Sequence, residues 1–162
     1  MVMANTSKKT IILFSGDMDK VLAAFVIANG AAAMGDEVTM FFTFWGLNTL
    51  RKPEKTITPK KTILQNMFSV MMPRGPKKLH MSNMNFAGMG PMLMKKAMRD
   101  QNVFSIDEMI AIAKEQNIKM IACTMSMDVM GLKKEELIDG LEYAGVASYL
   151  GEADEANVNL FI

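Results

Sequence analysis

The stretch MIACTMSMDVMGL, residues 120–132, holds Cys123, the single cysteine of this 162-residue chain. A cysteine becomes nucleophilic as a thiolate, and the end of a strand, just before a turn or helix, offers free backbone N–H groups that stabilise an anion. The loop residues that would supply this environment are Thr124, Met125, Ser126 and Asp128. Free cysteines are also often fully buried and inert. The residues alone therefore leave two interpretations open, a reactive thiol and a packing residue.

Two other segments end in residues that could face this cysteine. The run SGD follows one apolar strand-like segment, and FW stands near the end of another. Open parallel α/β sheets form their ligand crevice beyond the carboxyl ends of the strands. We therefore expect a pocket wall, with an apolar lid or subunit contact, built from Ser15, Gly16, Asp17, Phe44 and Trp45.

Other chemistry has weaker support. A Cys–His pair would need His80, the only histidine, which lies in a basic segment where a surface position is the alternative. Because there is no second cysteine, an internal CxxC redox cycle is excluded, and an intermediate on Cys123 must be resolved by a partner thiol, a substrate or another subunit. Asp17, Asp19 and Asp128 could gather at a metal, but capping and solvent exposure explain them more simply. Zinc spacing, a Walker loop and a dinucleotide fingerprint are absent, so no metal is expected.

Composition indicates a single globular domain, residues 1–162. Half of the residues are apolar and 22% are charged, and the net charge of +1 gives no general attraction to nucleic acid. One cysteine fits a reducing cytoplasm. The polar N-terminus does not resemble a signal peptide. The apolar run 21–35 is interrupted by Asn29 and is shorter than the roughly 20 residues of a membrane span, so we expect a buried helix.

Hydrophobic patterning predicts an α/β fold with a mainly parallel sheet. Expected strands cover residues 10–14, 37–46, 118–122, 146–150 and 158–162. Expected helices cover 18–34, a segment beginning at the capping box of Ser105 and Glu108, and 133–145. Asp17 or Ser15 could cap the first helix, and Gly35 would end it.

Residues 47–104 depart from this pattern and form a methionine-rich excursion. All five prolines lie here, and helices are expected at 60–71 and 91–100. Methionines suit adaptable cores and interfaces, although thioethers can also bind copper(I). The basic stretch MPRGPKKLHM, residues 72–81, is either a solvated loop or an attractor of an acidic partner or an anionic substrate.

Several segments resemble one known family. ILFSGDMDKVLAAFVIANGAAAMGDEVTMFFTFWGLNTLRK, MNFAGMGPMLMKKAMRDQNV, IACTMSMDVMGLKKEELIDGLEYAGVASYL and the ending NLFI are similar to DsrE/DsrF-like sulfurtransferases, most of all to the branch often labelled peroxiredoxin-like. The similarity covers nearly the whole chain, and FFTFWGL and CTMSMDVMG are the most specific segments. The threonine-containing motif that precedes a peroxidatic cysteine is absent, so the label does not establish peroxidase chemistry.

The resemblance implies a DsrE-like three-layer sandwich with a five-stranded sheet, assembled into trimers or hexamers. It implies that Cys123 carries sulfur as a persulfide, exchanged with TusA-like or rhodanese-like carrier proteins, without a metal or organic cofactor. It also raises membrane association, which the residues support only weakly. The alternatives are a non-catalytic oligomeric binding or assembly module, with Cys123 as packing, and a thiol redox sensor.

Overall fold

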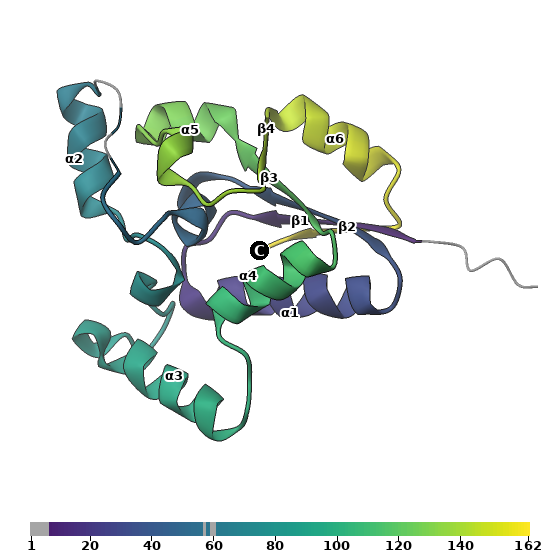
Figure 1. Cartoon of the computed structure of the whole chain (residues 1–162), viewed down its shortest axis with the longest axis horizontal. Helices are drawn as coiled ribbons and strands as arrows, with labels where there is room; N and C mark the ends of the chain where they lie inside the picture. The colour runs from purple at the N-terminus through teal and green to yellow at the C-terminus, as the bar shows by residue number, and fades with distance from the viewer. Residues whose placement is uncertain (1–6, 57, 59–60) are drawn as a thin grey trace, which may run out of the picture.

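A five-stranded, all-parallel sheet forms the centre of the computed structural model, which describes residues 7–56, 58 and 61–162 (Figure 1). The strand order is β4-β3-β2-β1-β5. The strands are β1 (Lys8–Leu13), β2 (Glu37–Phe42), β3 (Lys119–Cys123), β4 (Glu142–Ala144) and β5 (Val158–Phe161). The three central strands are rich in β-branched and large apolar residues that are buried on both faces, as expected for a covered parallel sheet.

Helices cover both faces of this sheet and complete three layers (Figure 1). α1 (Met18–Ala33) and α4 (Ile106–Glu115) lie side by side on one face, and α5 (Thr124–Met130) and α6 (Val146–Asp154) lie on the other. α1 ends before Gly35, whose φ of +91° suits glycine. Its one interrupting polar residue, Asn29, donates a hydrogen bond to the Met109 carbonyl of α4 (3.0 Å). The apolar run 21–35 is thus part of a core helix.

The apolar core has two parts of unequal size. The larger part lies between the sheet and the α1–α4 layer, with Leu13, Phe25 and Phe42 fully buried, and it continues through apolar residues of the excursion and of α5. The smaller part lies on the α6 face and consists of Phe41, Ile121, Cys123 and Tyr149. Since side chains alternate along a strand, Cys123 falls on the same face as Ile121.

The excursion between β2 and α4 is helical, as predicted. It contains the 3₁₀ segments Phe44–Leu50, Pro76–Lys78 and Phe86–Gly88 and the helices α2 (Ile63–Met71) and α3 (Met89–Asp100). α2 and α3 project from the same end of the sheet (Figure 1). The predicted start of α2 at residue 60 lies outside the described residues, and α3 begins two residues before its predicted start.

Three predicted elements were wrong. The segment 133–145 is not a helix: it contains the 3₁₀ turn Lys134–Glu136, Gly140 at φ +84° and then β4. The expected strand 146–150 is the first half of α6, which buries Tyr149 on one side. The strand expected over 37–46 ends at Phe42, because the chain turns into the 3₁₀ segment that begins at Phe44.

Candidate functional site

The ends of β1, β2 and β3 are neighbours, so the three predicted loops meet at one edge of the sheet. Leu13 pairs with Phe42, and Phe42 pairs with Ala122. The Thr43 N–H donates to the Leu13 carbonyl (3.1 Å), and the Gly46 N–H donates to the Phe14 carbonyl (2.9 Å). The structure therefore brings the segment after β1 against the segment after β2, beside the end of β3.

Close backbone packing holds the two first loops together. A Cβ atom on Gly16 would lie 2.9 Å from the Trp45 carbonyl oxygen. Phe44 adopts φ +44°, an uncommon conformation for a residue with a side chain, and its ring lies 5.7 Å from that of Phe14, centroid to centroid. Trp45 itself is 45% exposed at the surface of this edge. Phe44 and Trp45 thus lie at the edge of the sheet where the sequence predicted them.

Cys123 is the last residue of β3 and occupies the N-cap position of the seven-residue α5. Its side chain is only 2% exposed and packs in the small apolar cluster with Phe41 and Tyr149. The Tyr149 hydroxyl lies 3.1 Å from Thr10 Oγ1, which holds α6 down over this cluster. The thiol is therefore at the expected strand end but is closed off by α6 within a single chain.

The residues after Cys123 form a helix and not an open loop. Ser126 is fully buried, and its hydroxyl shares a 2.7 Å hydrogen bond with Thr43 Oγ1, which ties α5 to the end of β2. The Asp128 side chain is exposed, and the Asp128 carbonyl accepts a hydrogen bond from Gln65 of α2 (3.0 Å). Thr124 is half-buried and Met125 is exposed. Of the four predicted residues, Ser126 and Asp128 thus have contacts that fix α5 in place.

Asp17, one of the two residues predicted to cap α1, occupies the N-cap position, but its side chain makes no capping hydrogen bond. Its carboxylate accepts hydrogen bonds from Ser15 Oγ (3.1 Å) and Lys20 Nζ (2.9 Å), and its N–H donates to Ser15 Oγ (3.1 Å). This compact turn keeps Ser15, Gly16 and Asp17 together at the end of β1.

The three aspartates considered for a metal do not gather. Asp19 accepts hydrogen bonds from the Ser82 backbone (2.9 Å) and from the Ser82 hydroxyl (2.5 Å), which joins α1 to the excursion. Partial burial alone would raise the pKa of Asp19, but the Ser82 hydrogen bonds outweigh it and lower that pKa. No cluster of three or more His, Cys, Asp or Glu side chains suited to a metal occurs among the residues that the structure describes.

His80 contributes its backbone to this end of the molecule. Its carbonyl accepts a hydrogen bond from the Met18 N–H (2.6 Å) at the start of α1. Its exposed side chain lines a basic cavity between α2 and α3, and the lining of that cavity does not include Cys123. Within the described part of the chain, no hydrogen bond joins His80 to Cys123. The predicted assistance of His80 therefore has no support in this geometry.

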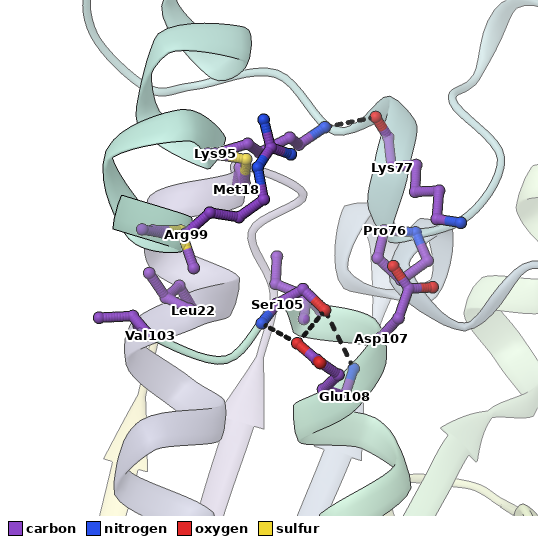
Figure 2. A pocket seen from close by; sticks show the side chains of 12 residues that line it. Met18, Leu22, Pro76, Lys77, Lys95, Arg99, Val103, Ser105, Asp107 and Glu108 are labelled. Atoms are coloured by element: carbon purple, nitrogen blue, oxygen red, sulfur yellow. Dashed lines mark hydrogen bonds between the residues drawn. The ribbon is translucent and has the colours of Figure 1, made fainter. Parts of the chain in front are cut away.

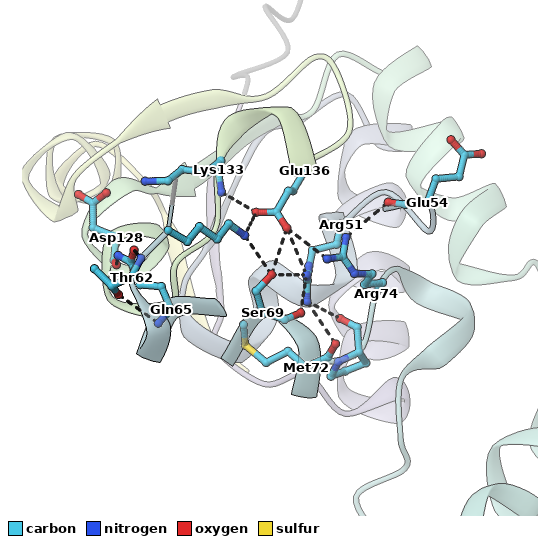
Figure 3. A network of polar contacts seen from close by, with 12 residues as sticks. Arg51, Glu54, Thr62, Gln65, Ser69, Met72, Arg74, Asp128, Lys133 and Glu136 are labelled. Carbon is cyan, nitrogen blue, oxygen red and sulfur yellow. Dashed lines mark hydrogen bonds and ion pairs between the residues drawn. The ribbon is translucent and has the colours of Figure 1, made fainter. Parts of the chain in front are cut away.

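Sequence reasoning missed a buried ionic cluster beside the site (Figure 3). Glu136 is 1% exposed, and its carboxylate contacts Arg51 (3.4 Å), Arg74 (3.4 Å) and Lys61. Ser69 Oγ (3.2 Å) and the Lys133 N–H (3.0 Å) also donate to this carboxylate. The cluster joins α2, the end of the first 3₁₀ segment and the turn after α5.

The pKa values of Arg51 and Glu136 are both lowered, for different reasons. Burial, followed by repulsion from Arg74, lowers the pKa of Arg51 to about 10. Burial alone would raise the pKa of Glu136, but the hydrogen bond from Lys61 and the surrounding cations outweigh it and lower that pKa. The only sign of this ionic cluster in the sequence is Arg51, which directly follows the apolar segment FWGLNTL.

The described residues include no helix with the length and apolar character needed to cross a membrane.

A family model described as the DsrE/DsrF/DrsH-like family matches residues 5–161. The chain belongs to this family. The predicted DsrE-like fold is confirmed, and so is the predicted family resemblance. Two solved DsrE-like structures agree in fold: the ychN protein of E. coli (TM-score 0.54, 13% identity, 97% of this chain and 100% of that one), and MTH1491 of Methanobacterium thermoautotrophicum, titled a protein of unknown function (TM-score 0.55, 10% identity, 95% and 98%).

Two relatives of this DsrE-family chain match along nearly their whole lengths. One is named "Uncharacterized protein YrkE" from Bacillus subtilis (strain 168), 55% identical over 157 residues, covering 97% of this chain and 98% of the relative. The other is named "Sulfur carrier protein DsrE2" from Allochromatium vinosum, 39% identical over 160 residues, covering 96% and 98%.

Proposed function

We propose that this protein is a sulfur carrier that holds sulfane sulfur as a persulfide on Cys123. The observation that carries the proposal is the position of the sole cysteine at the carboxyl end of β3, where the loops after β1 and β2 also meet. Membership of the DsrE family and 39% identity to a protein named as a sulfur carrier support the same role.

The transfer step exchanges one sulfur–sulfur bond for another. The Cys123 thiolate attacks the outer sulfur of a donor persulfide, R–S–SH. The donor S–S bond breaks, the donor leaves as a thiol, and Cys123–S–SH forms. An acceptor thiolate then attacks the outer sulfur of Cys123–S–SH and restores the thiol. No net oxidation occurs, so no cofactor is required.

The surroundings of Cys123 can be assigned roles in this scheme. The backbone amides of Thr124, Met125 and Ser126 would stabilise the thiolate, because N–H groups of the first turn of a helix lack partners within the helix. Asp128 lies in the second turn and would act only by holding α5 in place through its contact with Gln65. Ser15, Gly16 and Asp17 would form the facing wall. Phe44 and Trp45 would form the apolar lid or a subunit contact.

Burial of the thiol sets a condition on this mechanism. Because Tyr149 closes the cluster that holds Cys123, we propose that α6 opens locally when a partner binds. Short elements with few buried contacts open at low free-energy cost. The partners would be TusA-like or rhodanese-like carriers in the cytoplasm, and the working form a homo-oligomer such as a trimer or hexamer.

Intact-mass and peptide mass spectrometry test the proposal directly. The protein is incubated with thiosulfate and a rhodanese, and the expected product carries one additional sulfur atom on the peptide that contains Cys123. Reduction should remove it. Cys123→Ser is the control, and a Cys123→Ser chain that still acquires the sulfur atom would rule the proposal out.

A non-catalytic assembly module is the second candidate, and the 2% exposure of Cys123 favours it. The exposed apolar residues of α2 and α3, including Ile63, Met71 and Met92, would then serve an interface. Resistance of Cys123 to alkylation in the assembled native protein would support this candidate. A thiol redox sensor would instead give trapped sulfenic acid on Cys123 at low peroxide concentration.

A further inference from the structure

A second feature of the molecule lies in the excursion, away from Cys123. Residues 47–104 contain eleven Lys and Arg but only two Asp and Glu, which gives this segment a net charge of +9. The rest of the chain contains seven Lys and Arg and fifteen Asp and Glu, which gives it a net charge of −8. The overall charge of +1 therefore conceals a strongly basic excursion on an acidic body.

Part of this positive charge is concentrated around one cavity of about 700 Å³ between the carboxyl end of α2, the segment 72–80 and the first half of α3. No Asp or Glu is among the residues that line it. Its lining includes five cations and one histidine: Lys55, Arg74, Lys77, Lys78, Lys95 and His80. Among the described residues, no carboxylate lies within 4.0 Å of the Nζ atoms of Lys77, Lys78 or Lys95.

The remaining walls of the cavity are apolar. They come mainly from Val70, Met71, Met72, Leu79, Pro91 and Met92. A concave, largely apolar site of roughly 300–1,000 Å³ with a few convergent polar groups is typical of small-molecule binding sites. Flexible methionine side chains allow such walls to adapt to the shape of a ligand.

One contact shows how the cations are held close together. Lys95 of α3 donates a hydrogen bond to the Lys77 carbonyl (2.6 Å), so its ammonium group lies beside the chain that carries Lys77 and Lys78 (Figure 2). Burial lowers the pKa of Lys95, attraction from Asp107 opposes this shift, and the smaller repulsion from Lys77 adds to it. Like charges held together in a partly enclosed space repel, and an anion between them would relieve that repulsion.

Lys77 and Lys95 also line a neighbouring cavity of about 590 Å³, shown in Figure 2. The neighbour includes Asp107 and Glu108 in its lining, so its charge is mixed. Glu108 and Ser105 there satisfy one another in the predicted capping box at the start of α4. Of these two cavities, only the α2–α3 cavity has no carboxylate in its lining, and one of its cations, Arg74, is paired with Glu136 outside that lining.

The start of α3 adds to the positive potential. Gly88, Pro91 and Met92 line the cavity, so the first turn of this twelve-residue helix borders it. The N-cap residue is Gly88, which has no side chain to neutralise the helix end. The N-terminal end of a helix carries partial positive charge and favours anions.

We propose that the α2–α3 cavity binds a small organic anion with at least two negative charges and an apolar group. The cations would bind the charged part, and the methionine-lined walls would bind the apolar part. This site is independent of sulfur transfer at Cys123.

Three probes test the two parts of the proposal by isothermal titration calorimetry on the full chain at low salt, where charge attraction is least screened. 1-Naphthyl phosphate carries both features, inorganic phosphate only the charge, and 1-naphthol only the apolar group. We expect 1-naphthyl phosphate to saturate one site per chain and to bind more tightly than either other probe. Equal affinity for phosphate and 1-naphthyl phosphate would contradict the apolar part of the proposal.

Matched double variants locate the site. Lys77→Gln/Lys78→Gln removes two exposed cations from the lining and should raise the Kd for 1-naphthyl phosphate by about tenfold or more, which corresponds to about 1.4 kcal/mol. Lys96→Gln/Lys114→Gln removes the same charge outside the lining and should raise the Kd clearly less, because neither side chain lines the cavity. Lys95→Gln is a further variant and should also weaken binding. Equal weakening by both double variants, or no saturable binding to the unmodified chain, would overturn the proposal.

The same titration separates this site from the proposed sulfur chemistry. A Cys123→Ser chain should bind 1-naphthyl phosphate as tightly as the unmodified chain. A loss of binding in Cys123→Ser would contradict the independence of the two sites, whereas failure of sulfur transfer alone would leave the anion site unaffected.

Discussion

Phe41 of β2 and Tyr149 of α6 lie with their ring centroids 5.1 Å apart, and this contact closes α6 over the cluster that contains Cys123. Tyr149 is 5% exposed, and its hydroxyl lies 3.1 Å from Thr10 Oγ1 on β1. One side chain thus links α6 to two strands. It therefore holds α6 over the apolar cluster that contains Cys123.

Replacing Tyr149 by alanine should therefore expose Cys123. We expect the rate of its alkylation by iodoacetamide under native conditions to rise by about tenfold or more, since modification requires local opening. The loss of a buried aromatic ring should also lower the free energy of unfolding by about 3–5 kcal/mol. Alkylation kinetics followed by mass spectrometry, together with urea unfolding, measure both effects.

Tyr149→Phe is the matched control, because it keeps the ring and removes only the hydroxyl contact with Thr10. Its expected cost is about 1 kcal/mol, with a small change in alkylation rate. Equal alkylation rates in Tyr149→Ala and the unmodified chain would show that α6 is not the barrier.

The buried cluster around Glu136 should contribute strongly to stability. Glu136→Gln leaves Arg51 and Lys61 without their carboxylate in a buried setting, and breaking a buried ion pair from one side costs about 3–5 kcal/mol. The exposed Asp139, whose side chain is 95% accessible and pairs with Lys52, provides the control. Asp139→Asn should change the free energy of unfolding by less than about 0.5 kcal/mol. Similar values for the two variants in urea unfolding would contradict this assignment.

The sequence was most informative where the deciding contacts are local. The capping box needs only Ser105 and Glu108, three residues apart, and both of its hydrogen bonds are present. The ends of β1 and β3, predicted at residues 14 and 122, lie one residue away at Leu13 and Cys123, because each closes a continuous apolar run. The end of β2 was predicted four residues too late, at 46, because the apolar run continues into the 3₁₀ segment after Phe42. Their convergence at one edge then follows from the parallel sheet.

Non-local contacts were not accessible in this way. Arg51 and Glu136 are 85 residues apart in the sequence. No residue next to either of them indicates that the two form an ion pair. Misassigning residues 146–150 as a strand also hid the cover over Cys123, because only as a helix does this segment place Tyr149 against Phe41. Branched and aromatic residues such as Val146 and Tyr149 favour strands intrinsically, and tertiary packing overrode that preference.

The Glu136 cluster should also give the protein a specific sensitivity to acid. The pKa of Glu136 is lower in the folded chain than its unfolded value, which is about 4.3 for a free glutamate. Its stabilising contribution is therefore complete above the unfolded value and is lost as the pH falls through the folded one.

Urea unfolding of the unmodified chain and of Glu136→Gln at pH 7, 5, 4 and 3 isolates this contribution. The difference in unfolding free energy between the two should be constant from pH 7 to about pH 5 and should shrink below about pH 4. A difference that stays constant down to pH 3 would mean that Glu136 is not the titrating group.

Gly46 fixes the position of Trp45, and its replacement should disturb the predicted lid. A Cβ atom at residue 46 would lie 2.1 Å from the Leu13 carbonyl oxygen, so Gly46→Ala must displace the 3₁₀ segment that carries Phe44 and Trp45. We expect a loss of about 1–3 kcal/mol, as for other overpacked sites. Because Trp45 is the only tryptophan, its fluorescence emission should change as well.

Gly30→Ala is the control, because a Cβ atom at residue 30 would meet no atom within 4 Å. Alanine at this position in α1 should stabilise the chain by about 0.5–1 kcal/mol without altering the emission of Trp45. If Gly46→Ala left both stability and emission unchanged, the close approach of Gly46 to β1 would not be what positions Trp45.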